Sequence, residues 1–395
     1  MNTSLLSTAR MLLFAFAAGA MIANMYYLQP ILSLVARTFG IPVSTSGLIV
    51  SCTQLGYTLG ILMVVPLGDV LARRRLLTVM FVVNACALLA AALSPNFVVF
   101  GLAALISGTT SSAAMLIVPY VASIAPIEQR GRMVGLVMTG ALLAIPLSWL
   151  VSGGIGNFAG WRMVYGVACV AVILLLFLLR RSLPQEPERK GRDIHYGDLM
   201  KSLVQISARH APLRRRALYG ALGMASFSSL WTGLPILLSQ PPYSFPASTI
   251  GLMGITGIAG ALVPGLIGRL SDQGYKDHLT IGLALLMLAG WILLSFSVLG
   301  LWVIISAAIA LNVAVMGLQI THQSVIYKLE PSANSRITAV FVAVNFIGAA
   351  IGSALASIWL RHFGWESLCF LGAGFPALLL ITYCFTERAG RQQPT

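Results

Sequence analysis

The chain has 395 residues, of which 58% are hydrophobic and only 9% are charged. A water-soluble domain carries roughly 25% charged residues, so the composition excludes an ordinary soluble fold and predicts a polytopic membrane protein. The formal net charge of +14 would indicate nucleic-acid binding in a soluble protein, but here it accompanies long apolar runs. The five cysteines all lie inside such runs, without the spacing of a metal site or a disulfide framework.

A membrane-spanning helix needs about 20 mainly apolar residues. The first apolar run follows Arg10 and resembles a signal peptide, but it continues to about Val35 and therefore favours a retained first span. Twelve stretches of the chain meet the length criterion. The predicted spans are residues 11–35, 47–67, 76–94, 97–122, 133–154, 162–180, 217–239, 249–268, 279–297, 300–326, 337–360 and 365–386.

One long polar stretch, residues 181–216, separates the sixth span from the seventh. It contains two prolines, mixed charges and three consecutive arginines, and it predicts a cytoplasmic linker with a short amphipathic helix on the membrane surface. The predicted domains are therefore an N-terminal six-helix bundle in residues 1–180, this linker, and a C-terminal six-helix bundle in residues 217–395.

Lysine and arginine distribute unequally between the two sides of the predicted spans. When sides alternate from one loop to the next, 22 of the 25 basic residues share one side, and Arg37, Arg162 and Arg361 occupy the other. The positive-inside rule places the richer side in the cytoplasm. Both termini are thus expected in the cytoplasm, and the excess of positive charge is explained by topology.

Landmarks of the first six spans recur in the second six. Asp69 and Asp272 both follow a Leu-x pair in the loop after the second span of each half, at an offset of 203 residues. Ala159-Gly160-Trp161 and Phe363-Gly364-Trp365 open the sixth and twelfth spans, at an offset of 204 residues. These matches predict a duplicated six-helix unit whose two copies have parallel topology.

These residues resemble the major facilitator superfamily over the whole chain. In the loop between the second and third spans, Leu67, Asp69, Arg73 and Arg74 match a family pattern close to Gly-x-Leu-x-Asp-Arg-x-Gly-Arg-Arg. The loops at 126–132 and 268–274 and the stretch 23–30 are also similar, the last to bacterial drug, sugar and nucleoside efflux permeases. The resemblance implies an all-α membrane fold of twelve transmembrane helices in two pseudo-symmetric bundles.

Several positions depart from the family pattern. Val65, Val70 and Ala72 differ within the loop pattern, and Ala104 stands where drug:proton antiporters of the family usually have an arginine. The fifth span has Pro146 and Gly153-Gly154 but only part of the antiporter pattern. These departures weigh against proton antiport by the usual residues.

Polar residues inside the spans are candidate substrate contacts, because a buried polar group in hydrocarbon needs a partner or a wet cavity. In the resembled fold, the first, fourth, seventh and tenth spans line the central cavity. Hydrogen bonding between helices is an equally good explanation for each residue, and bonding to their own helix explains the serines and threonines of the fourth span. The candidates are Asn24, Tyr27, Gln54, Tyr57, Thr109, Ser112, Trp231, Asn312 and Gln319.

His322 is the one imidazole expected within a span, and it is the candidate for carrying a coupling proton. A neutral, hydrogen-bonded histidine is the simpler interpretation. None of the eleven Asp and Glu residues falls in the middle of a span. Neutral or weakly polar solutes therefore fit better than cations, which a buried carboxylate would attract.

The charged loops are candidates for a gate. A carboxylate at a cytoplasmic helix end can pair with nearby arginines or interact with a helix N-terminus, and breaking such contacts would accompany the change between outward-facing and inward-facing states. Simple topology charges or a solvated loop are the alternatives. The candidate gating residues are Asp69, Arg73, Arg74, Glu128, Arg130 and Asp272.

The sequence thus predicts a secondary transporter that exports a small organic solute across the bacterial inner membrane by alternating access, with proton coupling left open. Alternatives are an uncoupled facilitator or importer, and a non-transporting sensor. We find no nucleotide loop, nucleophile motif or metal cluster, so an enzyme is not expected. No cofactor, metal or nucleic-acid partner is expected, and a monomer in the lipid bilayer is the default.

Overall fold

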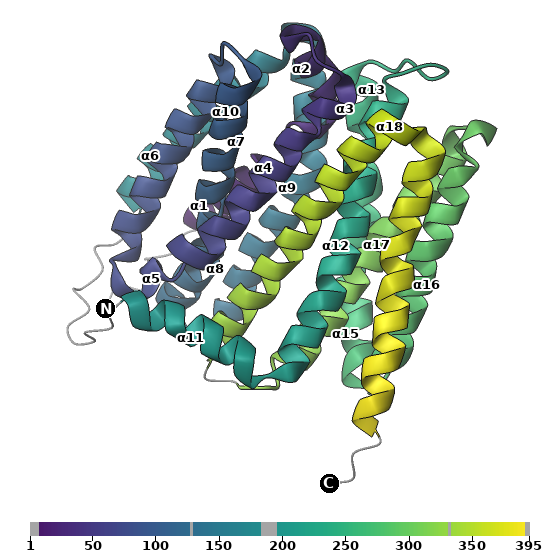
Figure 1. The fold of residues 1–395 in the computed structure, drawn as a ribbon. Helices are drawn as coiled ribbons and strands as arrows, with labels where there is room; N and C mark the ends of the chain where they lie inside the picture. Colours follow the sequence, from purple (N-terminus) through teal and green to yellow (C-terminus); the bar gives the residue numbers. More distant parts are fainter. Residues whose placement is uncertain (1–7, 127–128, 183–195, 331–332, 392–395) are drawn as a thin grey trace. The chain divides into compact units, whose positions relative to one another are not determined.

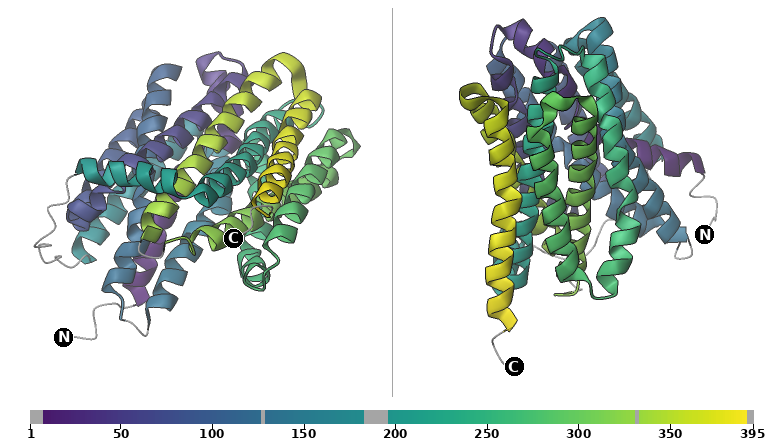
Figure 2. Two further views of the ribbon diagram at one scale, coloured as in Figure 1. Left: turned by 60° about the horizontal axis from the view of Figure 1, so that its bottom comes forward. Right: turned by 90° about the vertical axis from the view of Figure 1, so that its right-hand side faces the viewer.

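The computed structural model describes residues 8–126, 129–182, 196–330 and 333–391, and within these ranges it is helical, with no strand. Figures 1 and 2 show long helices joined by short connections. The helices of the first half are α1 (Thr8–Ala23), α2 (Leu32–Phe39), α3 (Val43–Ser46), α4 (Leu48–Leu59), α5 (Leu67–Val70), α6 (Arg73–Ala92), α7 (Phe97–Ser111), α8 (Ala113–Ile124), α9 (Arg130–Ala159) and α10 (Trp161–Ser182).

The second half begins after α11 (Tyr196–Arg209), which lies in the predicted linker and buries Leu203 and Ile206. Its helices are α12 (Ala211–Leu238), α13 (Ala247–Leu252), α14 (Thr256–Leu262), α15 (Pro264–Asp272), α16 (Lys276–Ser295), α17 (Leu301–Ile326) and α18 (Asn334–Arg391). The predicted amphipathic helix in the linker is therefore present. The seventh span begins at Ala211 rather than at residue 217, because Pro212 suits the first turn of a helix.

The helices account for the twelve predicted spans. Among the described residues, ten helical stretches are long and apolar enough to cross a membrane, and the last of them, Asn334–Glu387, holds two predicted spans. The first predicted span is the shorter apolar helix α1 with its continuation, η1 (Gln29–Ile31) and α2. The all-α fold of twelve spans is thus confirmed.

The first span is not one continuous helix, as the sequence led us to expect. Helix α1 ends at Ala23, a turn follows, and the chain resumes as η1 at Gln29. Pro30 is the physical reason, since its ring would clash with the carbonyl of residue 26 in a continuous helix and it has no N–H to donate. The break turns Asn24 and Tyr27 away from a common helix face.

Glycines with positive φ separate the last two spans of each half. Gly160, at φ 85°, ends α9, and Gly364, at φ 77°, divides α18 into its two predicted spans. Figure 1 shows the second turn at the top of α18. Left-handed backbone at these angles favours glycine over every other residue. The two landmarks of the internal repeat therefore mark the same backbone turn.

The described chain divides into two compact units. One comprises Met1–Phe39, Cys52–Met200 and Pro246–Gly254, and the other comprises Gly40–Ser51, Lys201–Phe245 and Ile255–Thr395. Each unit thus includes a short segment from the other half of the sequence. Within the first unit, Gly251 of α13 lies against the backbone of Trp149, and within the second, Gly47 lies against Thr232 and Ser357.

Candidate substrate and coupling site

Asn84, a residue that the sequence analysis did not select, is the centre of a buried polar network in the first unit. Its side chain is fully buried on α6. Its carbonyl oxygen accepts a hydrogen bond of 2.8 Å from Nδ2 of Asn24, and its own Nδ2 donates to Oγ1 of Thr110 at 2.8 Å and to the carbonyl oxygen of Ser107 at 3.2 Å. These bonds join the end of α1 to α6 and α7.

The break after α1 separates two candidate residues. Asn24 is buried and points to Asn84, whereas Tyr27 is partly exposed and lines a groove together with Ser148 of α9. A continuous helix would have placed the two side chains, three residues apart, on one face. Pro30 is the sequence signal for this break, but the contact of Asn24 with Asn84 joins residues 60 positions apart and has no local signal.

The polar residues of α7 and α8 bond to their own helix, as the sequence predicts. Oγ1 of Thr109 donates to the carbonyl of Leu105 at 2.9 Å, and Oγ of Ser112 donates to the carbonyl of Thr109 at 2.7 Å. Thr110 and Ser111 make similar bonds. On α4, Gln54 and Tyr57 are both buried.

In the second unit, the candidate amides lie on α17. Asn312 is buried, and its Nδ2 donates to the carbonyl of Ala308 at 2.8 Å in its own helix. Gln319 is partly exposed, and its side-chain oxygen accepts a bond of 2.8 Å from Nδ2 of Asn345 on α18. Trp231 of α12 is buried, with its ring 6.0 Å from that of Phe227. Asn345 was missed because a single amide in a long apolar run carries no spacing signal.

His322 is completely buried on α17, and neither ring nitrogen has a hydrogen-bond partner among the described residues. The expectation of a hydrogen-bonded histidine is therefore not met. Its imidazole ring lies 5.7 Å from the ring of Tyr219 on α12. A buried imidazole without a partner is costly, so this histidine requires a reason other than packing alone.

Charged and phenolic side chains extend from His322 toward the ends of α12, α16 and α18. The guanidinium of Arg216 pairs with Glu387 at 3.1 Å and lies 5.8 Å from the ring centre of Tyr219. The hydroxyl of Tyr383 donates to Asp277. Arg216 is buried although the sequence analysis assigned it to the linker, and the misplaced start of α12 explains this error.

The predicted gating residues are described only in part. Glu128 lies outside the described residues. Asp69 lies on α5, but its side chain is not described. Nη1 of Arg73 reaches the carbonyl of Pro119 at 3.4 Å, and Nη2 of Arg74 donates to the carbonyl of Arg180 at 3.0 Å. These arginines therefore join α6 to α8 and α10.

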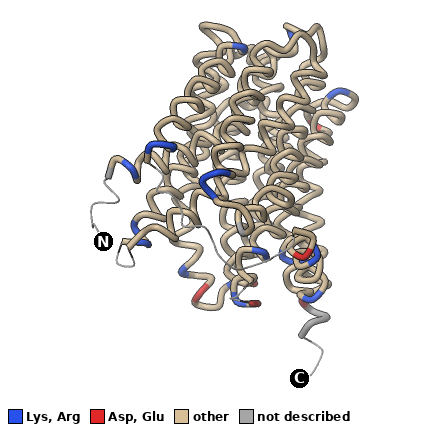
Figure 3. The backbone as a smooth tube through the Cα atoms, turned by 90° about the vertical axis from the view of Figure 1, so that its left-hand side faces the viewer, with Lys and Arg blue, Asp and Glu red and all other residues tan. Residues whose placement is uncertain are grey.

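Arg130 and Asp272 are the two remaining candidate gating residues. Both side chains are exposed, Arg130 at the first residue of α9 and Asp272 at the last residue of α15. Figure 3 marks the basic and acidic residues along the chain. The described residues contain no group of three or more His, Cys, Asp or Glu side chains that could hold a metal ion.

The sequence model of the protein family described as Major Facilitator Superfamily matches residues 14–329, which is most of the chain. The protein belongs to the Major Facilitator Superfamily. It is a multi-pass membrane transporter and not an enzyme, as the sequence led us to expect. The family membership explains the paired six-span organisation of the sequence.

Curated relatives of this superfamily member cover almost its full length. It is 37% identical to the "Uncharacterized transporter YgaY" of Escherichia coli O157:H7 over 96% of this chain and 95% of the relative. It is 25% identical to a "Probable sugar efflux transporter" of Helicobacter pylori, covering 94% of each chain.

Solved structures of the superfamily share the fold. A bacterial homologue of the lysosomal transporter Spinster matches with a TM-score of 0.77 and 13% identity, over 98% of this chain and 97% of that one. A D-xylose-proton symporter matches with a TM-score of 0.71 and 16% identity, over 95% and 96%.

Proposed function

We propose that this transporter exports a small neutral or amphipathic organic solute, such as a sugar or nucleoside, from the bacterial cytoplasm. Alternating access of the two halves, residues 1–180 and 217–395 joined by residues 181–216, would carry the solute across the inner membrane. A relative named as a probable sugar efflux transporter supports both the solute class and the direction.

The chemistry of the buried polar groups is the observation that carries this proposal. The described carboxylates stand at or near helix ends, as Asp272, Asp277 and Glu387 illustrate. Deeper in the spans, the polar groups are amides and hydroxyls, exemplified by Asn84, Thr110 and Asn312, while the buried imidazole of His322 lies four residues before the end of α17. Amides and hydroxyls bind sugar-like hydroxyl groups by hydrogen bonds, whereas a cation would need a carboxylate.

Proton coupling through His322 is the finer part of the proposal. An imidazole titrates near physiological pH, and one without a hydrogen-bond partner is free to change its protonation state without breaking a bond. The neighbouring Tyr219, which bonds to Thr386, leads from His322 toward the ionisable groups near the end of α18. Protonation there would therefore be coupled to the packing of α12 against α17 and α18.

The test is a flux assay in liposomes loaded with a pH-sensitive dye, with sugars, nucleosides and amphipathic drugs added in turn. We expect one compound to cross and to move protons in the opposite direction, and His322→Gln to abolish the proton movement. His278→Gln is the matched control, because His278 is exposed at the start of α16. Solute flux without protons would establish a facilitator, and binding without flux would establish a sensor.

The solute contacts are tested separately by binding. We propose that Gln54, Tyr57, Trp231 and Gln319 face the solute, and that Asn24 contributes only its side-chain oxygen, because its Nδ2 donates to Asn84. Gln319→Ala should weaken binding about tenfold by removing one hydrogen-bonding group from the site. Gln240→Ala, an exposed amide after α12, should leave binding unchanged. Equal affinities of the two variants would remove Gln319 from the site.

A further inference from the structure

A long apolar groove runs along the surface of the first unit, and none of the residues of the polar network around Asn84 lines it. It has a volume of 690 Å³ and lies between α1, α9 and α10. Its floor is made of small residues, because Gly19 and Gly140 bring α1 and α9 close together: a Cβ on Gly140 would lie 2.8 Å from the carbonyl oxygen of Ala15. Its walls are large side chains such as Phe16, Leu147 and Leu174, each more than half exposed.

The groove offers almost no hydrogen-bonding capacity. Of the hydroxyls that line it, Thr139 donates to the carbonyl of Gly135 at 2.9 Å, and Ser148 donates to the carbonyl of Ile145 at 2.7 Å. Tyr27, four residues after the end of α1, is the third hydroxyl-bearing residue that lines it. A sugar or nucleoside would gain little here, whereas an alkyl chain would bury apolar surface against the walls.

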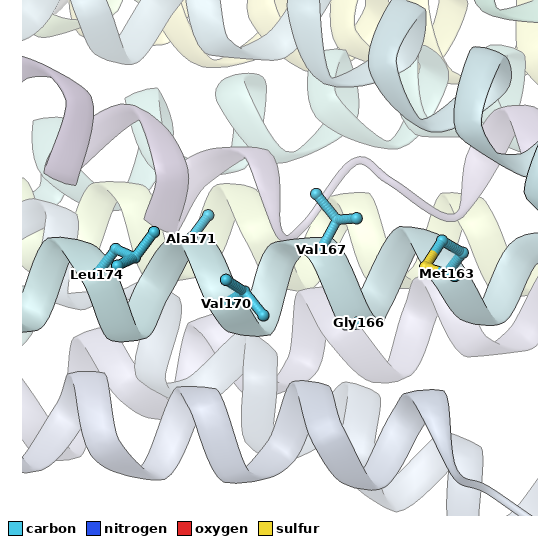
Figure 4. A pocket seen from close by; sticks show the side chains of 6 residues that line it. All are labelled: Met163, Gly166, Val167, Val170, Ala171 and Leu174. Carbon is cyan, nitrogen blue, oxygen red and sulfur yellow. The ribbon is translucent and has the colours of Figure 1, made fainter.

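The groove has the length and setting of an acyl chain. It follows α9 from Leu136 to Val151, which is about 22 Å at 1.5 Å per residue, compared with about 15 Å for half of a bilayer's hydrocarbon core. A second cavity of 360 Å³ continues along α10 from Leu174 to Met163 (Figure 4). Only 28% and 33% of the residues in the most apolar stretches of α9 and α10 are buried. The side chains along the groove would therefore be accessible to lipid.

Two exposed arginines flank one end of the groove. Arg132 stands one helical turn before Leu136 on α9, and Arg181 stands three residues after Leu178 on α10, with its guanidinium 4.0 Å from the ring centre of Phe177. The sequence of α1, α9 and α10 contains no Asp or Glu. This end is therefore positive, and it belongs to the side where the sequence places most of the basic residues.

We propose that this groove binds an anionic phospholipid, with one acyl chain lying between α1, α9 and α10 and the phosphate paired with Arg132 and Arg181. An apolar channel that ends at basic side chains, which form no ion pair with a described carboxylate, matches the two parts of such a lipid, since arginine binds phosphate through paired N–H donors. Basic sites of this kind between transmembrane helices select anionic headgroups over zwitterionic ones.

The experiment measures lipid retention by native mass spectrometry of the detergent-purified protein, titrated with phosphatidylglycerol or with phosphatidylcholine of the same acyl chains. Two arginines near the headgroup should favour phosphatidylglycerol about 30-fold. Arg132→Gln with Arg181→Gln should remove this preference and leave phosphatidylcholine binding unchanged. Arg75→Gln, an exposed arginine at the start of α6, is the matched control and should keep the preference.

The acyl-chain part is tested by filling the groove. Ala171→Phe on α10 and Ala20→Phe on α1 should each reduce phosphatidylglycerol retention at least about tenfold, since a phenyl ring occupies the space of several methylenes. Ala90→Phe, at an exposed alanine of α6, should have no effect. Thermal unfolding midpoints close to that of the wild type verify that the variants fold. Because the two substitutions lie on different helices, a local defect at one site would not explain the same result at both.

Three results would overturn the proposal. These are equal retention of the two lipids by the wild type, undiminished phosphatidylglycerol binding by both phenylalanine variants, or complete displacement of the lipid by a transported solute. The last result would identify the groove as a solute path. None of these outcomes depends on proton coupling, so the lipid site and the proposed function can fail independently.

Discussion

The buried polar groups of the two halves differ in kind. In the first unit, Asn84 joins Asn24, Ser107 and Thr110 through neutral hydrogen bonds. In the second, an arginine–glutamate pair joins α12 to α18, and His322, four residues before the end of α17, is buried without a hydrogen-bond partner among the described residues. A duplicated six-helix unit can therefore keep one backbone plan while its two copies bury different polar groups, and we propose proton coupling through His322 for the second copy alone.

A second difference lies at one close contact between helices. In the first unit, a Cβ on Gly108 would overlap the carbonyl oxygen of Thr53, so α4 and α7 touch through their backbones. The residue 204 positions later is Asn312, which lies against Gly260 of α14. Both halves use glycine for close contact, Gly108 in the first and Gly260 in the second, but only the second half has an amide side chain at the position equivalent to Gly108.

Introducing an asparagine at Gly108, as at the equivalent residue Asn312, should cause the largest loss of stability. Gly108→Asn forces α4 and α7 apart, and we expect about 3 kcal/mol of destabilisation, at the upper end of overpacking costs. The measurement is the thermal unfolding midpoint in detergent. Gly135→Asn is the control, because a Cβ on Gly135 meets no atom within 4 Å. Equal midpoints for the two variants would show that the contact at Gly108 is not required.

Glu387→Gln should have the next largest effect. The variant leaves the guanidinium of Arg216, only 7% exposed, without its charged partner, and Glu387 itself is 31% exposed. Losing a partner in a fully buried pair costs about 3–5 kcal/mol, and the partial exposure lowers our expectation to about 2 kcal/mol. Adding Arg216→Met should recover most of the lost stability. The measurement is the free energy of unfolding in denaturant. A double variant less stable than Glu387→Gln would contradict the explanation.

Asn84→Leu tests the neutral network of the first unit. Removing the amide leaves Asn24 and Thr110 without their shared partner, and bonds between membrane helices contribute about 0.6–2 kcal/mol each. We expect a loss of about 1.5 kcal/mol in unfolding free energy, with no dependence on pH because no group in the network titrates in the physiological range. A loss that changes between pH 6 and pH 8, where histidine titrates, would show that the network is coupled to an ionisable group.

Asn96→Ala should give the smallest effect. The Asn96 side chain caps α7 by accepting a bond of 2.9 Å from the amide of Val99, and losing such a cap costs about 1 kcal/mol. Thermal unfolding is again the measurement, and Asn96→Asp, which keeps the acceptor, should remain close to the wild type. If both substitutions cost the same, capping does not explain the role of this residue.

Much of the fold follows from sequence alone because lipid leaves few options. Apolar length predicted the spans, and the Gly160 and Gly364 repeats predicted matching positions that prove to share one backbone turn. The bonding of the Thr109–Ser112 stretch to its own helix also followed from residue type. These features depend on local chemistry, which the sequence expresses directly.

The candidate site was less predictable because its key contacts join distant helices. Asn84 is a single amide in an apolar run, and only packing reveals the partners 60 residues before it and 26 residues after it. Arg216 was assigned to the linker because a charged residue usually ends a span, yet Glu387, 171 residues later, allows it to be buried. Local patterns contain no information about such pairs.

The two glycine turns also have a consequence for handedness. At φ 85° and 77°, Gly160 and Gly364 occupy backbone that an L-residue enters only with about 1–3 kcal/mol of strain. The mirror-image region is ordinary extended backbone, so a D-alanine placed at either position by chemical ligation would fit without that cost. The fifth and sixth spans of each half are thus joined at the achiral Cα of a glycine, where D-alanine should be better tolerated than L-alanine.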